Sequence, residues 1–201
     1  MSVNAQQMKL FWENMAGQAV EANELEPRLN EAVILIQWAI ESDYGTSSLC
    51  LTSHNYAGIT TGDGKTFLTY ATVGDFVKAY VKEMHLKYYT LVLQSDDFMA
   101  QAHALGASPW AGSHYEGNTG TEGGLIVEIY NEQREYIMAA LKAAYDEKEG
   151  KKEKETGQGT QPVKQPQFWI QSGGYSSLEN AQLVIDFCKA HGFWAAIYER
   201  I

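Results

Sequence analysis

The chain has 201 residues, of which 45% are hydrophobic and 12% aromatic, and its formal net charge is −10. This length accommodates one domain of ordinary size plus a small additional element, and the hydrophobic content excludes a disordered chain. The charge is uneven, because residues 1–146 carry 8 Lys+Arg against 18 Asp+Glu while residues 147–201 carry 7 of each. An acidic main domain argues against nucleic-acid binding, since phosphate contacts require clustered Lys and Arg.

Residues 3–21 open the chain with apolar side chains at three- and four-residue spacing. This spacing predicts a helix with one apolar face, formed by Met8, Phe11, Trp12, Met15 and Ala19. The first residues contain one Lys and no long apolar core, so they do not resemble a secretory signal. We expect no membrane span.

A second helix is predicted from near Pro27 to about Ser42. Its centre is a nine-residue run, residues 32–40, that is interrupted among apolar side chains only by Gln37. The run is too short to cross a bilayer and too apolar for a surface helix, so we expect it to be buried. Glu41 follows at once, where apolar surroundings and the negative end of the helix dipole both raise a carboxyl pKa. A raised pKa is what a general acid needs near neutral pH.

The remainder of residues 1–146 is predicted to be mostly helical. Residues 43–70 contain turn formers and suggest a short hairpin around residues 61–64, since Asp63-Gly64 is a good two-residue turn. Helical spacing returns at residues 74–89, at residues 95–105, and in a long helix that begins at Asn118 or Thr121. Residues 106–117 are expected to form a loop rich in aromatic and small side chains.

Three stretches resemble the bacterial endo-β-N-acetylglucosaminidase family of autolysins. Residues 37–47, QWAIESDYGTS, resemble the helix end that carries the acid, and residues 55–59, NYAGI, resemble the next signature, where a phenylalanine usually stands in place of Ala57. Residues 67–70 followed by 73–81 resemble the family's aromatic-containing stretch before a helix. The resemblance covers roughly residues 25–140. It implies an α+β, mainly helical, lysozyme-like catalytic domain with a small β-hairpin lobe.

The same resemblance implies a glycoside hydrolase that cleaves peptidoglycan after N-acetylglucosamine, with Glu41 as proton donor and no cofactor. Other interpretations remain open: a lytic transglycosylase or muramidase on a lysozyme-like fold, or a non-catalytic glycan-binding component of a phage tail. The enzyme is expected to act at the bacterial cell wall. Without a signal, it would arrive by phage or holin release or by tail delivery, unless the signal has been removed from this form of the chain.

The second catalytic group is not identified by its sequence position. Glycosidases usually use two carboxylates, and relatives often place an acid in a longer hairpin, but here the interval of residues 60–66 contains only Asp63. Asp63, Glu116 and Glu122 are the candidates. Alternatively, the acetamido oxygen of the substrate attacks, and Trp110 or Tyr115 orients that amide. Trp110 occupies the place of a tyrosine in the family's late loop, so Tyr115 is expected to take over the hydroxyl role.

Aromatic and polar residues of the same stretches are expected to bind the glycan. Tyr44, Tyr56 and Trp110 would present flat apolar faces to sugar rings, and Asn55 would bond the substrate or tie its loop down. His114 and Glu116 belong to the candidate loop and are expected either to line the groove or to lie on the surface. Neither a C-x-x-C nor an H-E-x-x-H pattern is present, so we predict no metal site.

The C-terminal quarter divides into two parts. Residues 147–167 are charged and contain Pro and a single aliphatic side chain, which predicts a flexible linker. Residues 168–201 show a β-α-β pattern that resembles the first half of the sporulation-related repeat domain, a peptidoglycan-binding module. Because one β-α-β unit is marginal alone, we expect either a homodimer through this segment or its packing on the main domain.

Overall fold

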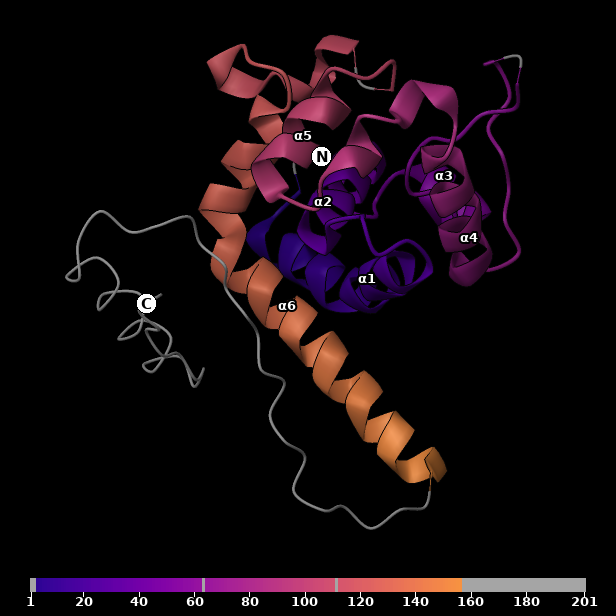
Figure 1. Ribbon diagram of the computed structural model, residues 1–201. Coiled ribbons are helices and arrows are strands. Elements are labelled where there is room, and N and C mark those ends of the chain that lie inside the picture. The colour runs from indigo at the N-terminus through magenta and orange to yellow at the C-terminus, as the bar shows by residue number, and fades with distance from the viewer. Residues whose placement is uncertain (1–2, 63, 111, 157–201) are drawn as a thin grey trace, which may run out of the picture. The chain divides into compact units, whose positions relative to one another are not determined.

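The computed structural model describes residues 3–62, 64–110 and 112–156 (Figure 1). In these ranges the chain forms helices and connecting loops, and a single compact unit extends to Glu155. The α helices are α1 (Ala5–Leu25), α2 (Glu31–Ser42), α3 (Ser48–Ser53), α4 (Val73–Met84), α5 (Phe98–Gly106) and α6 (Gly124–Thr156). Short 3₁₀ helices are η1 (Lys87–Tyr89), η2 (Val92–Gln94), η3 (Gly112–Tyr115) and η4 (Gly117–Thr119).

Helix α1 begins with a capping box, in which Asn4 and Gln7 each accept a hydrogen bond from the other's backbone N–H. This arrangement satisfies two of the N–H groups that a helix start leaves without partners. The apolar stripe expected from the sequence is buried, including Phe11 and Trp12 at 4% and 1% exposure. The helix packs against α2 and α4.

Helix α2 is the buried centre of the unit. Asn30 caps its start by accepting from the N–H groups of Ala32 and Val33, and every residue from Ala32 to Ala39 is buried. Each large aliphatic side chain in such a position contributes about 1.5–3 kcal/mol of burial free energy. In Figure 1, α2 lies in the middle of the other helices. The expected buried helix is confirmed.

The end of α2 turns the chain sharply. Ser42 donates from Oγ to the carbonyl of Trp38 at 2.6 Å and accepts from the N–H of Gly45 at 2.8 Å. Asp43 and Tyr44 both adopt left-handed φ values, 51° and 52°. This turn ends the helix directly after Glu41 and holds that side chain at the last turn.

The expected β-hairpin lobe is not present in the residues that the structure describes. A single antiparallel bridge joins Thr60 to Phe67, and backbone hydrogen bonds connect Thr61 to Thr66 and Leu68 to Ile59. Most of residues 60–67 lie on the surface. The chain therefore reverses direction without burying the apolar face that a stable sheet requires. The expected α+β class becomes an all-helical arrangement over the described ranges.

Helices α5 and α6 meet at two glycines. A Cβ placed on Gly106 would lie 2.0 Å from the N atom of Gly123, and one on Gly123 would lie 2.2 Å from the carbonyl oxygen of Ala102. No side chain fits there, so glycine at both positions allows the two backbones to touch. This contact positions the loop of residues 107–123, which includes η3.

Helix α6 continues through residues 147–156, the first half of the segment that its composition suggested as a linker. Opposite charges four residues apart explain why this polar stretch is helical: Lys142 pairs with Asp146, and Glu147 with Lys151 at 2.7 Å. Such pairs stabilise an exposed helix by a few tenths of a kcal/mol each. Residues 157–167 and the expected β-α-β segment, 168–201, lie outside the described residues.

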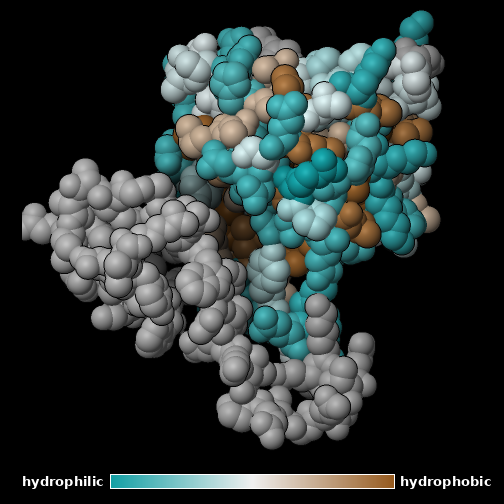
Figure 2. All heavy atoms as spheres, in the orientation of Figure 1, coloured by the Kyte–Doolittle hydropathy of each residue, from teal (hydrophilic) through white to brown (hydrophobic). Residues whose placement is uncertain are grey.

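The visible surface of the described residues is mainly hydrophilic. The face shown in Figure 2 carries mostly hydrophilic side chains, with hydrophobic ones scattered between them. Among the helices of the described ranges, none combines the length and the hydrophobicity that a bilayer crossing needs.

Candidate active site

Glu41 lies at the last turn of α2, partly buried. Its Oε1 accepts a hydrogen bond from the hydroxyl of Tyr115 at 2.6 Å. Burial raises the pKa of the Glu41 carboxyl, while the Tyr115 hydrogen bond and the charge of His114 lower it. The raised pKa agrees with the position of this side chain at the end of an apolar helix.

Gly58 lies against the other oxygen of the same carboxyl. Its φ is +63°, a conformation that favours glycine, and a Cβ on it would lie 3.6 Å from Glu41 Oε2. Glycine therefore allows residues 55–59 to approach the acid. The Glu41 carboxyl is held between this loop and Tyr115.

Phe67 is a neighbour of this site that the sequence analysis did not assign to binding. Its ring lies 3.9 Å from the same Cβ position on Gly58, and the residue is 54% exposed. An exposed aromatic ring beside a carboxyl is a suitable surface for the apolar face of a sugar. The sequence feature that pointed to Phe67 was its position at the start of the aromatic-containing stretch, residues 67–70.

A buried polar network lies next to Tyr115. Tyr80 donates from its hydroxyl to Oε1 of Gln37 at 2.5 Å, and Gln37 and Tyr115 are both completely buried. The Nε2 of Gln37 has no partner at ordinary hydrogen-bond length, but the amide lies close enough to the Tyr115 hydroxyl to lower the pKa of that group. Burial raises the Tyr115 pKa well above its usual value. The hydroxyl therefore keeps its proton and donates it toward Glu41.

Trp110, in the loop of residues 107–123, packs beside this network. Its Nε1 donates to the carbonyl oxygen of Ala57 at 3.1 Å, and its ring packs on those of Tyr80 and Tyr89, at centroid distances of 5.8 and 5.3 Å. It is half-buried. Trp110 thus ties the late loop to residues 55–59 and keeps part of its ring accessible.

Asn55 has a structural role in this conformation. It is 1% exposed, and its amide donates to the carbonyls of Ile59 and Leu68 while accepting from the N–H of Ile59. Its amide group is occupied inside the protein, so it ties the loop down and does not reach a substrate. These bonds agree with the second of its two expected roles, tying the loop down.

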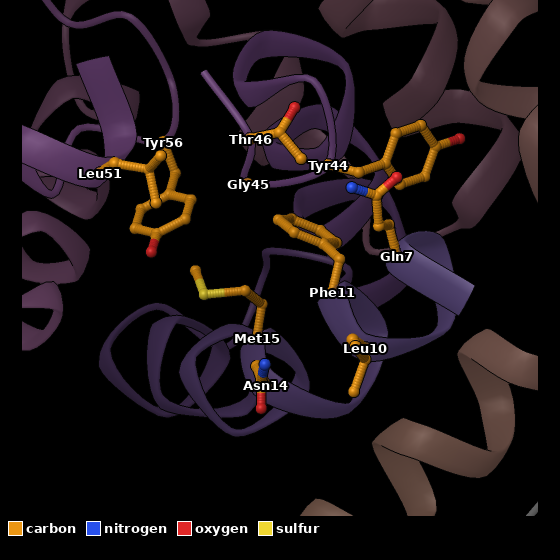
Figure 3. Close-up of a pocket in the computed structure, with 10 residues that line it drawn as sticks. All are labelled: Gln7, Leu10, Phe11, Asn14, Met15, Tyr44, Gly45, Thr46, Leu51 and Tyr56. Atoms are coloured by element: carbon orange, nitrogen blue, oxygen red, sulfur yellow. The ribbon is translucent and has the colours of Figure 1, made fainter. Parts of the chain in front are cut away.

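Tyr44 and Tyr56, which were expected to bind the glycan, share one pocket. Tyr44 accepts a hydrogen bond from Gln133 Nε2 at 3.2 Å. Both tyrosines border a surface pocket of about 310 Å³ beside α1 (Figure 3), and Glu41 is not among the residues that line it.

The expected second carboxylates do not join Glu41 in the described residues. Glu122 is exposed and forms an ion pair with His103 at 3.1 Å. Glu116 is also exposed and begins η4. Asp63 lies outside the described residues. His114 is exposed and lies near enough to Glu41 to lower its pKa.

Glu83 is a second carboxyl with a raised pKa, which the sequence analysis missed. Burial raises the pKa of this half-buried residue of α4, and its charge raises the pKa values of Tyr70 and Tyr89. It is not among the groups that shift the pKa of Glu41. The signal in the sequence was a glutamate between the apolar positions Val81 and Met84.

Metal binding was not expected from the sequence. In the ranges that the structure describes, His, Cys, Asp and Glu side chains do not gather in groups of three or more that could hold an ion.

Comparison with known proteins identifies one family. Residues 17–177 match the Glucosaminidase family, described as mannosyl-glycoprotein endo-beta-N-acetylglucosaminidase. The match includes α2, the loop of residues 55–59 and η3, and it extends ten residues into segment 168–201. No curated protein and no solved structure matches the chain.

Proposed function

Because the chain belongs to the Glucosaminidase family, whose members are glycoside hydrolases that act on peptidoglycan, we propose that it cleaves the β-1,4 bond after N-acetylglucosamine, with Glu41 as the general acid. The observation that supports this proposal is the Glu41 carboxyl itself. It is half-buried, its pKa is raised, and it lies between a buried tyrosine hydroxyl and a glycine.

The raised pKa favours the protonated form of Glu41, which bond cleavage requires. In that form the carboxyl can donate to the glycosidic oxygen as the C1–O bond breaks. Burial is the largest cause of the shift. The leaving sugar then departs as a neutral alcohol rather than as an alkoxide.

The substrate's own acetamido group is the proposed nucleophile. The interval of residues 60–66, where relatives often place a second acid, contains only Asp63, and Glu116 and Glu122 are exposed, which supports a route without a second carboxylate. The acetamido oxygen forms a bond to C1, the C1–O bond breaks, and Glu41 gives its proton to the leaving oxygen. Glu41 then takes a proton from a water that attacks C1, which reopens the ring intermediate and retains the configuration.

Tyr115 acts through Glu41 in this proposal. It is completely buried, so its hydroxyl orients the carboxyl rather than the substrate amide. Phe67 and the accessible part of Trp110 supply apolar faces for the sugars on either side of the bond.

The acid is tested by Glu41→Gln, with Glu83→Gln as a matched control. Both replace a half-buried glutamate of raised pKa on an α helix. We expect Glu41→Gln to lower the release of soluble muropeptides from purified sacculi by about 10²–10⁴-fold, the contribution of general acid catalysis. Glu83→Gln should keep nearly full activity. Full activity in Glu41→Gln would refute the assignment.

The bond and the route are tested by product analysis. Mass spectrometry of the released fragments should show N-acetylglucosamine at the new reducing ends. N-acetylmuramic acid there would indicate a muramidase, and its anhydro form a lytic transglycosylase. Asp63→Asn tests the two-carboxylate route, because full activity of this variant would exclude Asp63 as the second carboxylate.

A further inference from the structure

A pocket lies beside α1, and Glu41 is not among the residues that line it. One wall belongs to α1, with Gln7, Phe11 and Asn14, and the opposite wall belongs to Thr46 and Tyr56. Figure 3 shows the rings of Phe11 and Tyr56 at the pocket with the side chain of Met15 beside them, and the two ring centroids are 6.5 Å apart. Its volume of about 310 Å³ lies at the lower end of the range for small-molecule sites, about 300–1,000 Å³.

The lining is chemically neutral. It combines aromatic and aliphatic surface with two amides, Gln7 and Asn14, and with the hydroxyl of Thr46, and it contains no Asp, Glu, Lys, Arg or His. Asn14 is exposed on α1. Leu10 and Leu51 lie at the pocket with 47% and 67% of their surfaces exposed. A ligand for such a site is uncharged, carries an amide and hydroxyls, and has one apolar face.

The pocket shares its backbone with the candidate active site. Thr46 lies five residues after Glu41, in the turn that ends α2, and Tyr56 lies two residues before Gly58, which touches the Glu41 carboxyl. The α1 wall, in contrast, lies before residue 17, where the family match begins. One wall of the pocket therefore lies outside the segment that matches the family.

From these observations we infer that the pocket binds an N-acetylglucosamine unit of a glycan strand. The acetamido and hydroxyl groups meet the amides and Thr46, and the apolar face of the ring meets Phe11 or Tyr56. N-acetylmuramic acid carries a carboxylate or a charged peptide, which the neutral lining does not match. The inference rests on the proposed function for the identity of the polymer. The pocket would then bind the glycan strand at a place other than Glu41.

The test uses the full chain with Glu41→Gln, so that the ligand is not cleaved. Amide ¹H–¹⁵N spectra are recorded during titration with tri-N-acetylchitotriose. Signals of Phe11, Asn14 and Thr46 should shift, and Asn14→Leu should weaken that response about fivefold, the loss expected for one amide hydrogen bond of about 1 kcal/mol. Asn131→Leu, the same change at an exposed asparagine of α6 outside the pocket, should leave it unchanged.

The outcomes separate this inference from the proposed function. Gly58 and His114 report on the acid, so shifts there with none at Phe11, Asn14 and Thr46 would overturn the pocket assignment while leaving the enzyme in place. Shifts at the pocket, with full sacculus hydrolysis by Glu41→Gln, would support the pocket and reject Glu41 as the acid. An equal response to cellotriose, which lacks acetamido groups, or to a short apolar peptide would overturn the assignment to N-acetylglucosamine.

Discussion

Replacing Tyr115 by phenylalanine should move the high-pH limb of the activity profile upward. Glu41 works in its protonated form, so activity falls as the pH rises through its pKa. The Tyr115 hydroxyl donates to the carboxylate and lowers that pKa. Without the hydroxyl the ionised form loses a partner, the pKa rises, and the acid stays protonated to a higher pH.

The size of the shift follows from the geometry. The O–H···O distance of 2.6 Å is in the range of charge-assisted hydrogen bonds. Such bonds contribute about 1.5–3 kcal/mol, and one pKa unit corresponds to about 1.36 kcal/mol. Because Glu41 is only partly buried, we take the lower end and expect a shift of about one pH unit.

The assay is the rate of sacculus clearing between pH 4 and pH 9, with circular dichroism to verify the fold. Tyr136→Phe is the control, since Tyr136 lies on α6 with 57% of its surface exposed. If the Tyr115→Phe rate is too low to profile, the Glu41 pKa is read directly from its carboxyl ¹³C signal. A limb or a pKa that stays in place, or that moves to lower pH in a folded variant, would refute the reasoning.

Three further predictions concern stability and the loop at the acid. Glu26 is 6% exposed, accepts hydrogen bonds from Arg28 and lies 2.9 Å from His85 Nε2. The Arg28 hydrogen bond is the largest cause that lowers the Glu26 pKa to about 2. Since Arg28 and His85 are half exposed, we expect the ionised form of Glu26 to contribute about 1–2 kcal/mol to the free energy of unfolding. That contribution is complete above the unfolded pKa of 4.5 and is lost as the pH falls toward 2. In urea unfolding at pH 7, Glu26→Gln should therefore have a lower free energy of unfolding than the unchanged chain, and at pH 2 this difference should vanish. Gly58→Ala should lower the free energy of unfolding by about 1–2 kcal/mol because of the left-handed φ at this position. It should also reduce hydrolysis at least tenfold by displacing the loop from Glu41. Unchanged hydrolysis would show that the loop does not position the acid. Gly123→Ala should lower the melting temperature by about 10 °C, since an added methyl would meet the Ala102 carbonyl at 2.2 Å, whereas Gly17→Ala, with open space around it in α1, should leave it unchanged or raise it.

The positions that the sequence identified correctly are those set by local periodicity. The apolar stripe of α1, the buried run of α2 and the place of Glu41 at the end of that run all follow from side-chain spacing. The raised pKa of Glu41 follows from the same pattern, because a carboxyl at the end of a buried helix must be partly desolvated. The hairpin was overpredicted, because a good turn dipeptide does not supply the buried face that a sheet needs.

The partners of Glu41 could not be derived from spacing. Tyr115 lies 74 positions away along the chain, and Gly106 and Gly123 let α5 and α6 approach closely enough to position its loop. Spacing also could not show that Asn55 faces inward or that Tyr44 and Tyr56 line the pocket beside α1. The sequence by itself determined that Glu41 lies at the end of a buried apolar run, because burial of one helix follows from the spacing of its own residues. Only the tertiary structure decided what surrounds that carboxyl, because contacts between distant segments depend on how whole helices pack.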